Sequence, residues 1–176
     1  RSSAASDVYK RQIKSSKDAI DVTGSSSANI TLEGDNKIFS ETGSALHISD
    51  GNVTINGSGS LKAEIQDDLG SDYNHNAKIG SHEKEAMSGN IHITGDATVK
   101  TDDNIAPNCG GDGAGIGTGE NGEMSGNIVI DGNAQVEVSS NDRGAGIGTG
   151  DDGNLSGNIM IGGNAQVSAT GAEDSA

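Results

Sequence analysis

The sequence predicts an all-β fold, a right-handed parallel β-helix (β-solenoid) of about five coils, each with three short strands and roughly 30 residues. Three observations support it. A block of sequence recurs at a fixed interval, apolar residues alternate with polar ones at three places in each interval, and no stretch has a helical period. The right hand is expected because crossovers between parallel strands are almost always right-handed.

The repeat is clearest in the second half of the chain, where three blocks return after 31 residues. A fixed period of this size indicates structural units that stack on one another. The matching blocks are AGIGTG at residues 114–119 and 145–150, SGNIVI and SGNIMI at 125–130 and 156–161, and GNAQV at 132–136 and 163–167.

Each strand is expected to turn two apolar side chains inward, two positions apart, as the pleat requires. In coil order, the first strand supplies Ile20/Val22, Leu46/Ile48, Ala77/Ile79, Ala114/Ile116 and Ala145/Ile147. The second supplies Ile30/Leu32, Val53/Ile55, Ile91/Ile93, Ile128/Ile130 and Ile159/Ile161. The third supplies Leu61/Ala63, Ala97/Val99, Ala134/Val136 and Ala165/Val167, and its first copy, near Ile38 and Phe39, is ambiguous.

Asparagine and glycine mark the corners of the coils. An Asn precedes the second strand each time, and stacked side-chain amides would form a hydrogen-bonded ladder. The ladder residues are Asn29, Asn52, Asn90, Asn127 and Asn158. Glycines that follow strands suit corners with positive φ, namely Gly34, Gly57, Gly95, Gly132 and Gly163. A further strip, Gly115, Gly117, Gly146 and Gly148, faces outward by parity, which indicates either close approach of a ligand or a second surface to the backbone, or a tight bend.

The two ends of the chain suggest a fragment. Residues 1–12, RSSAASDVYKRQ, look like a translated sequencing-adaptor remnant and are excluded from the predicted fold. Residues 13–171 are expected to form one solenoid domain, and 172–176 to begin a truncated next coil. Such a fragment would lack caps, so its open sheet edges would favour aggregation, and flanking domains of the same chain are expected partners.

The composition is acidic and poor in aromatic residues, with a formal net charge of −15, one Phe, two Tyr and no Trp. This charge repels nucleic acid phosphates and anionic lipid, so neither is an expected partner. No apolar run is long enough for membrane insertion. The scarcity of aromatic residues predicts a narrow core of small aliphatic side chains.

Acidic, glycine-rich turns in the late coils are candidate calcium sites, because calcium binds six to eight oxygen ligands. The candidate ligands are Asp112, Glu120, Asp151 and Asp152. Carboxylates exposed to water are the alternative interpretation of the same turns.

Three longer loops, residues 66–76, 81–88 and 101–113, gather around the third coil. Loops on a rigid scaffold commonly carry function, so they supply the candidate ligand-binding residues. These are Asp67, Asp68, Tyr73, Asp102 and Asp103, of which Tyr73 is the candidate for stacking on a sugar ring.

Catalysis is not expected, and no catalytic residue is predicted. A glycoside hydrolase needs carboxylates that face one groove, whereas the Asp67–Asp68, Asp102–Asp103 and Asp151–Asp152 pairs are adjacent and point two ways. His47 and His92 fall at outward strand positions, where a solvated imidazole is expected. A fragment of a polysaccharide lyase or hydrolase is the exception left open.

The segments ANITLEGDNKI, SALHISDGNVTINGSGSLKAE and the two AGIGTG…SGNI repeats carry a resemblance to known proteins. Over about residues 19–171 the chain is similar to a bacterial parallel β-helix carbohydrate-binding domain family and to Gly-rich repeat regions of secreted and cell-surface proteins. The resemblance implies an extracellular or cell-surface bacterial location and calcium-dependent binding of plant cell-wall polysaccharides, including acidic ones.

Two functions follow as hypotheses. One is a non-catalytic carbohydrate-binding module, with calcium as an assisting cofactor and polysaccharide as partner. The other is a passive stalk or adhesin-like spacer. The clustered loops favour the first, and the varied outward residues Asp21, His47, Lys78 and Gly115 favour the second.

Overall fold

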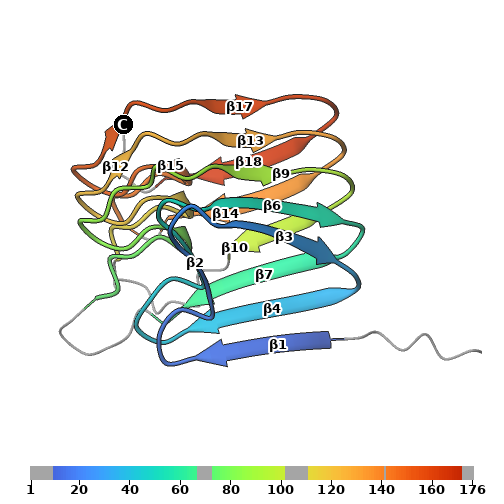
Figure 1. The fold of residues 1–176 in the computed structure, drawn as a ribbon, viewed down its shortest axis with the longest axis horizontal. Helices are drawn as coiled ribbons and strands as arrows, with labels where there is room; N and C mark the ends of the chain where they lie inside the picture. Colours follow the sequence, from blue (N-terminus) through green and yellow to red (C-terminus); the bar gives the residue numbers. More distant parts are fainter. Residues whose placement is uncertain (1–9, 67–72, 102–110, 141, 172–176) are drawn as a thin grey trace, which may run out of the picture.

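The computed structural model describes residues 10–66, 73–101, 111–140 and 142–171. These residues form β-strands joined by turns, and the strands stack in parallel from one coil to the next (Figure 1). The predicted all-β parallel β-helix is therefore confirmed. Among the described residues there is no helix that could span a membrane.

Three parallel sheets, here named A, B and C, run along the solenoid. From β2 onward the chain passes through them in the order B, C, A in each coil. Sheet A contains β1 (Lys10–Ser15), β4 (Asp35–Ser40), β7 (Ser60–Ile65), β10 (Thr98–Thr101), β14 (Gln135–Ser139) and β18 (Gln166–Thr170). Sheet B contains β2 (Ile20–Val22), β5 (Leu46–Ile48), β8 (Ile79–Gly80), β11 (Ile116–Gly117) and β15 (Ile147–Gly148). Sheet C contains β3 (Ser27–Leu32), β6 (Asn52–Gly57), β9 (Ile91–Ile93), β13 (Ile128–Ile130) and β17 (Ile159–Ile161).

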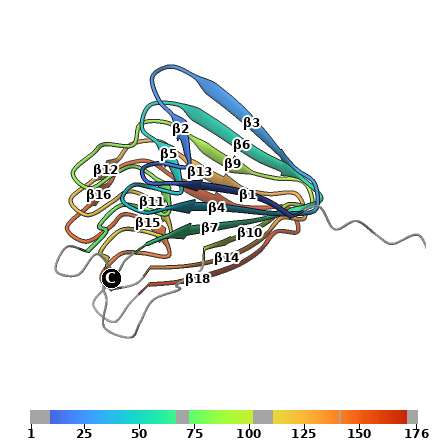
Figure 2. The same ribbon diagram turned by 90° about the horizontal axis from the view of Figure 1, so that it is seen from below.

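A short fourth pair widens the late coils on the side of sheet B. It joins β12 (Glu123–Met124) to β16 (Asn154–Leu155), and Met87 extends it through one bridge to Met124. Figure 2 shows sheets A and C converging at one corner, with sheet B and the β12–β16 pair on the opposite side. The cross-section is therefore a wedge.

The core is a set of aliphatic columns inside this wedge. Ile79 and Ile116 stack in one column on sheet B, Ile91 and Ile128 stack in another on sheet C, and all four are fully buried. Branched side chains suit these positions because they pack well on a pleated surface, and burial of each stabilises the fold by roughly 1.5–3 kcal/mol. Ile38 is 2% exposed, so the ambiguous first copy of the third strand turns Ile38, not Phe39, inward.

Matching the inward pairs of successive coils in order, as they are given in the sequence analysis, implies a strand register. At one junction between coils in each sheet, the observed register differs from it by two residues. Ile30 pairs with Ile55 rather than Val53, Leu46 pairs with Ile79, and Leu61 pairs with Val99. A shift of two keeps every side chain on its original face, so both registers bury the same residues. The lengths of the connecting turns, not the alternation, decide between them.

The first strand extends into the segment that the sequence interpretation excluded. Residues 10–12 lie in β1 and continue the parallel ladder with β4, where Arg11 pairs with Asn36 and Gln12 with Lys37. Parallel pairing uses main-chain groups, so any extended residues next to Ile13 can continue it. Within the described residues, β1 therefore includes residues 10–12, which the sequence interpretation had left out of the fold.

The glycine strip of sheet B is a site of close coil-to-coil contact. Gly80, Gly117 and Gly148 stack in register with φ of 141°, 142° and 141°, and a Cβ on Gly117 would lie 1.7 Å from the Gly148 carbonyl oxygen. Gly115 and Gly146 are likewise buried. The structure supports the close approach of a second surface, because a Cβ on Gly115 would lie 2.8 Å from the Ser139 carbonyl oxygen and a Cβ on Gly146 would lie 2.6 Å from the Thr170 backbone nitrogen. The five predicted corner glycines all have positive φ, which confirms that prediction.

Two residues that were predicted to face solvent on sheet B are buried instead. His47 is 5% exposed and Lys78 is 2% exposed. The segment that follows β8 and the end of β14 cover this part of the sheet, so Glu85 reaches His47 and the Ser139 carbonyl accepts a hydrogen bond from Lys78 Nζ at 3.0 Å. The alternation of residues in the strands does not predict these covering contacts.

Candidate functional site

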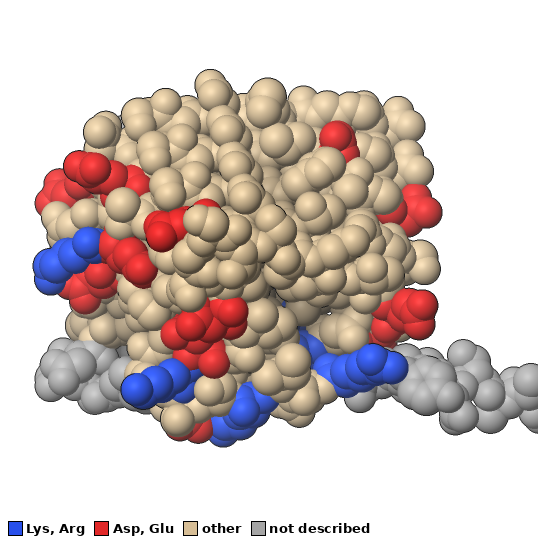
Figure 3. Space-filling view, viewed as in Figure 1, with Lys and Arg blue, Asp and Glu red and all other residues tan. Residues whose placement is uncertain are grey.

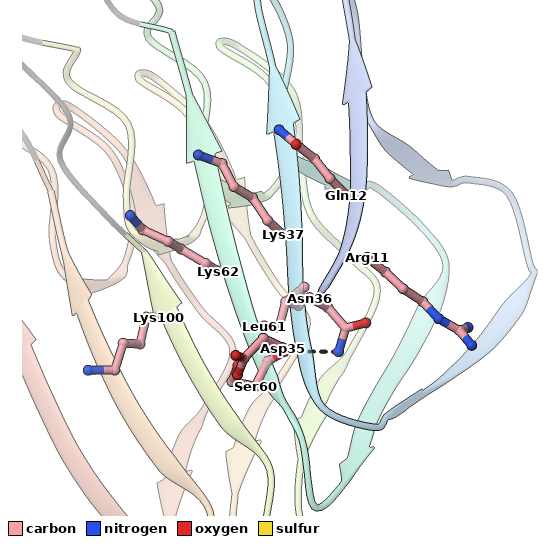
Figure 4. Close-up of a pocket in the computed structure, with 9 residues that line it drawn as sticks. All are labelled: Arg11, Gln12, Asp35, Asn36, Lys37, Ser60, Leu61, Lys62 and Lys100. Atoms are coloured by element: carbon pink, nitrogen blue, oxygen red, sulfur yellow. Dashed lines mark hydrogen bonds between the residues drawn. The ribbon is translucent and has the colours of Figure 1, made fainter. Parts of the chain in front are cut away.

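The outer face of sheet A carries a groove of about 370 Å³ lined largely by polar and cationic side chains (Figure 4). Strand register places Lys37 of β4, Lys62 of β7 and Lys100 of β10 side by side in one row. Gln12 of β1 begins the row, and Asp35 and Ser60 form the row beside it. Because neighbouring parallel strands lie about 4.8 Å apart, the row presents ammonium groups at that spacing on β4, β7 and β10, and Glu137 of β14 follows Lys100 in the same row.

A second hollow of about 350 Å³ continues along the same sheet. It shares Lys100 with the first and is lined further by Thr98, Gln135, Glu137, Gln166 and Ser168 among others. Together the two hollows extend from β1 to β18, across all the strands of sheet A. Their path runs along the solenoid axis, at right angles to the strands.

Ion pairs hold the lysine row in place. Glu64, whose side chain is 2% exposed, accepts from Lys37 and Lys62 at 2.5 and 2.7 Å, and Lys100 pairs with Glu137 at 2.5 Å. The lysine side chains themselves are 38–53% exposed. Figure 3 shows most of the Lys and Arg side chains that are visible in that view gathered toward the end where β1 and β4 lie. The acidic molecule thus has a locally cationic surface.

A second cluster links three coils through His47. Its Nδ1–H donates to Asp21 of β2 at 2.8 Å and its Nε2–H donates to Glu85 at 2.7 Å. Burial lowers the pKa of His47, but its hydrogen bonds to Glu85 and Asp21 outweigh burial and raise the pKa above its ordinary value. The imidazole of His82 stacks on this ring and bonds Asp18 at 2.7 Å.

A third cluster, after the lysine row and the His47 cluster, consists of His75, Asp112 and Glu120. It lies at the turns before β8 and on either side of β11. His75 Nδ1 is 2.8 Å from Glu120 Oε2 and 3.1 Å from Asp112 Oδ2, while the Asp112 backbone N–H lies 3.5 Å from the same nitrogen. Tyr73 meets the His75 ring edge-on, with centroids 6.4 Å apart. Two predicted calcium ligands, Asp112 and Glu120, therefore come together, and they share a histidine that the prediction omitted.

The other two predicted calcium ligands are placed differently. Asp151 lies next to Asp112, because its backbone N–H donates to the Asp112 carbonyl at 2.9 Å, but its carboxylate bonds Arg143 at 3.1 Å. Asp112 and then Asp151 raise the pKa of Arg143. Asp152 is exposed in a turn with φ of 52°. The four residues do not form one all-oxygen cluster.

Most of the predicted ligand-binding residues lie outside the described part of the chain. This holds for Asp67, Asp68, Asp102 and Asp103. Tyr73 is described and is 41% exposed, so it is accessible to a ligand. The predicted site residues that the structure does describe do not line the grooves of sheet A.

The asparagine ladder runs through four of its five predicted members. Asn90 donates to Asn52, Asn127 to Asn90, and Asn158 to Asn127, at 2.6, 2.8 and 2.9 Å. Asn29 is not part of this ladder, because Ser27 stands opposite Asn52 and the Asn29 amide oxygen accepts from Asn56 instead, at 2.8 Å. The reason is the two-residue difference in register described above.

Sequence reasoning missed the lysine row and the two histidine clusters. The row had a detectable signal, since Lys37, Lys62 and Lys100 each occupy an outward position of a third strand. The pairing of His75 with Asp112 and Glu120 had none, because it depends on how the turns fold. No protein-family model, no curated protein and no solved structure matches this chain.

Proposed function

We propose that the chain is a non-catalytic carbohydrate-binding module that holds an acidic polysaccharide along the grooves of sheet A. The observation that carries the proposal is the in-register row Lys37, Lys62 and Lys100, which lines an open path along the solenoid axis. An extended polyanion with a carboxylate on each sugar would meet three successive ammonium groups, one each on β4, β7 and β10. The resemblance to β-helix carbohydrate-binding proteins supports the same ligand class and an extracellular or cell-surface location.

The ion pairs of the row are compatible with such a ligand. An ammonium group has three N–H donors, so Lys37 and Lys100 retain hydrogen-bonding capacity beyond their pairs with Glu64 and Glu137. Exposed pairs such as Lys100–Glu137 contribute only about 0–1 kcal/mol, so exchange for a ligand carboxylate costs little. The lysines also remove the need for a calcium bridge, so binding is expected to persist with a chelator.

The carboxylates of the grooves favour binding over hydrolysis. Asp35 accepts from Ser60 Oγ and Glu137 pairs with Lys100. They lie on β4 and β14, with β7 and β10 between, which separates their strands by about 14 Å. Glycosidases hold their two carboxyl groups about 5–9.5 Å apart. Assays for reducing ends and for unsaturated sugar products are therefore expected to stay blank.

Affinity electrophoresis tests the proposal directly. Wild-type protein is expected to be retarded in gels that contain polygalacturonate, with or without chelator, and to migrate freely in gels that contain a neutral galactan. Lys100→Gln should weaken the retardation severalfold. Lys84→Asn is the matched control, because Lys84 has the same charge, is exposed, and has a φ of 60° that Asn tolerates.

A passive stalk is the second candidate, favoured by the continuous core that joins the coils into one rod. Absence of retardation by every glycan, with normal folding, would support the stalk. Retardation that disappears with chelator would instead support the calcium-assisted form of binding.

A further inference from the structure

In the cluster of His75, Asp112 and Glu120, two carboxylates lie close to one nitrogen of the imidazole ring. Glu120 Oε2 and Asp112 Oδ2 lie 2.8 and 3.1 Å from His75 Nδ1. In either protonation state of the ring, Nδ1 carries at most one proton, so it can form one good hydrogen bond and not two. The second carboxylate then adds negative charge without a matching donor on that nitrogen.

Asp112 provides an independent observation at the same place. The residue is only 8% exposed, and within the described part of the chain its Oδ1 atom is buried without a hydrogen-bond partner. A buried carboxylate oxygen left without a donor or a cation is costly, because it has lost its hydration. The other oxygen of that carboxylate is the one that faces His75.

We propose that His75, Asp112 and Glu120 bind a divalent transition-metal cation of the zinc class. Zinc bonds to imidazole nitrogen and carboxylate oxygen measure about 2.0–2.2 Å, so tetrahedral ligand atoms lie about 3.3 Å apart. The observed separations of 2.8 and 3.1 Å need only a small opening to admit the ion. The three donors bind the cation in place of the proton that Nδ1 would otherwise share.

Charge and donor type select this class of cation. Asp112 and Glu120 together balance a divalent ion, since the neighbouring Asp151 is paired with Arg143. Imidazole nitrogen suits zinc, copper, nickel and iron, whereas calcium takes oxygen ligands. The site therefore differs from the calcium site that the acidic turns alone predicted.

The other histidine cluster does not offer the same geometry. Asp18, His47 and His82 also lie close together, but the two rings are stacked 3.9 Å apart and only 6° from parallel. A metal lies near the plane of each imidazole that binds it, so it cannot lie in both planes here. Both ring nitrogens of His47 also bond carboxylates already.

Zinc titration of the full chain tests the proposal. Calorimetry is expected to find one site per chain, and thermal melting should show an increase in Tm with Zn²⁺ or Co²⁺ but not with Ca²⁺. His75→Asn and Glu120→Gln should each weaken zinc affinity by about tenfold or more. Bound Co²⁺ should give a visible absorption band of a low-coordinate site that His75→Asn abolishes.

The controls are His82→Asn, which removes a histidine of the other cluster, and Glu123→Gln, which removes an exposed carboxylate of β12. Both are expected to keep zinc affinity within about twofold. Three results would overturn the proposal: no zinc binding by wild type, equal binding by His75→Asn, or loss of binding in His82→Asn alone.

Discussion

The imidazole rings of His47 and His82 are stacked, with centroids 3.9 Å apart and planes 6° from parallel. His47 also joins Asp21 of the first coil to Glu85 of the third. A charged ring between two carboxylates therefore connects three coils of the solenoid.

Stability should depend on the protonation of His47. The pKa of His47 is raised in the folded state. Its protonation therefore stabilises the fold fully below the pKa of the unfolded chain, about 6.5, and this stabilisation is lost as pH rises through the pKa of the folded state. The urea midpoint of wild type is thus expected to fall as pH rises above about 6.5. His47→Gln should flatten this decrease. His92→Gln, which removes an exposed histidine paired with Asp131, should preserve it, and an unchanged slope in His47→Gln would contradict the prediction.

The glycine strip should not tolerate a side chain. In Gly117→Ala the new Cβ would clash with the Gly148 carbonyl oxygen, and the φ of 142° is unfavourable for alanine. A loss of about 3 kcal/mol or more in unfolding free energy is expected. Gly162→Ala is the matched control, because a Cβ there meets nothing within 4 Å, and it should change stability by less than about 0.5 kcal/mol. Similar losses in both variants would show that coil contact is not the cause.

The asparagine ladder should contribute measurably at its centre. Asn127 donates its amide to Asn90, and its Oδ1 accepts from both the backbone and the side chain of Asn158. Asn127→Ala removes these bonds, and a loss of about 1–3 kcal/mol is expected by chemical denaturation. Asn164→Ala, which removes a single amide bond to Asn133, should cost about 0.5–1.5 kcal/mol. The ladder would be unimportant if Asn127→Ala cost no more than Asn164→Ala.

The fold was predictable because its signal is local. Alternation of residues such as Ile128 and Ile130 identifies the inward face, and glycines such as Gly132 mark the corners with positive φ. The register was not predictable to within two residues, because a shift of two preserves that face. This is why Asn29 was assigned to the wrong ladder.

The candidate sites were predictable only in part. The acidic turns correctly indicated that Asp112 and Glu120 lie together. The role of His75 could not be inferred, because it joins that pair through the path of the turns rather than through strand periodicity. Burial of His47 and Lys78 was missed for a similar reason, since it depends on contacts from Glu85 after β8 and from Ser139 at the end of β14, which the alternation within sheet B does not reveal.

Titration calorimetry with polygalacturonate, in the presence of a chelator, tests the central claim most directly. The informative variant combines Lys37→Gln, Lys62→Gln and Glu64→Gln, because removing the lysines alone would leave the buried Glu64 carboxylate without its two cations. Wild type is expected to bind with an affinity that decreases as salt increases, and the triple variant to bind at least about tenfold more weakly at equal Tm. Equal affinity in both proteins would contradict the assignment of the grooves on sheet A as the polysaccharide site.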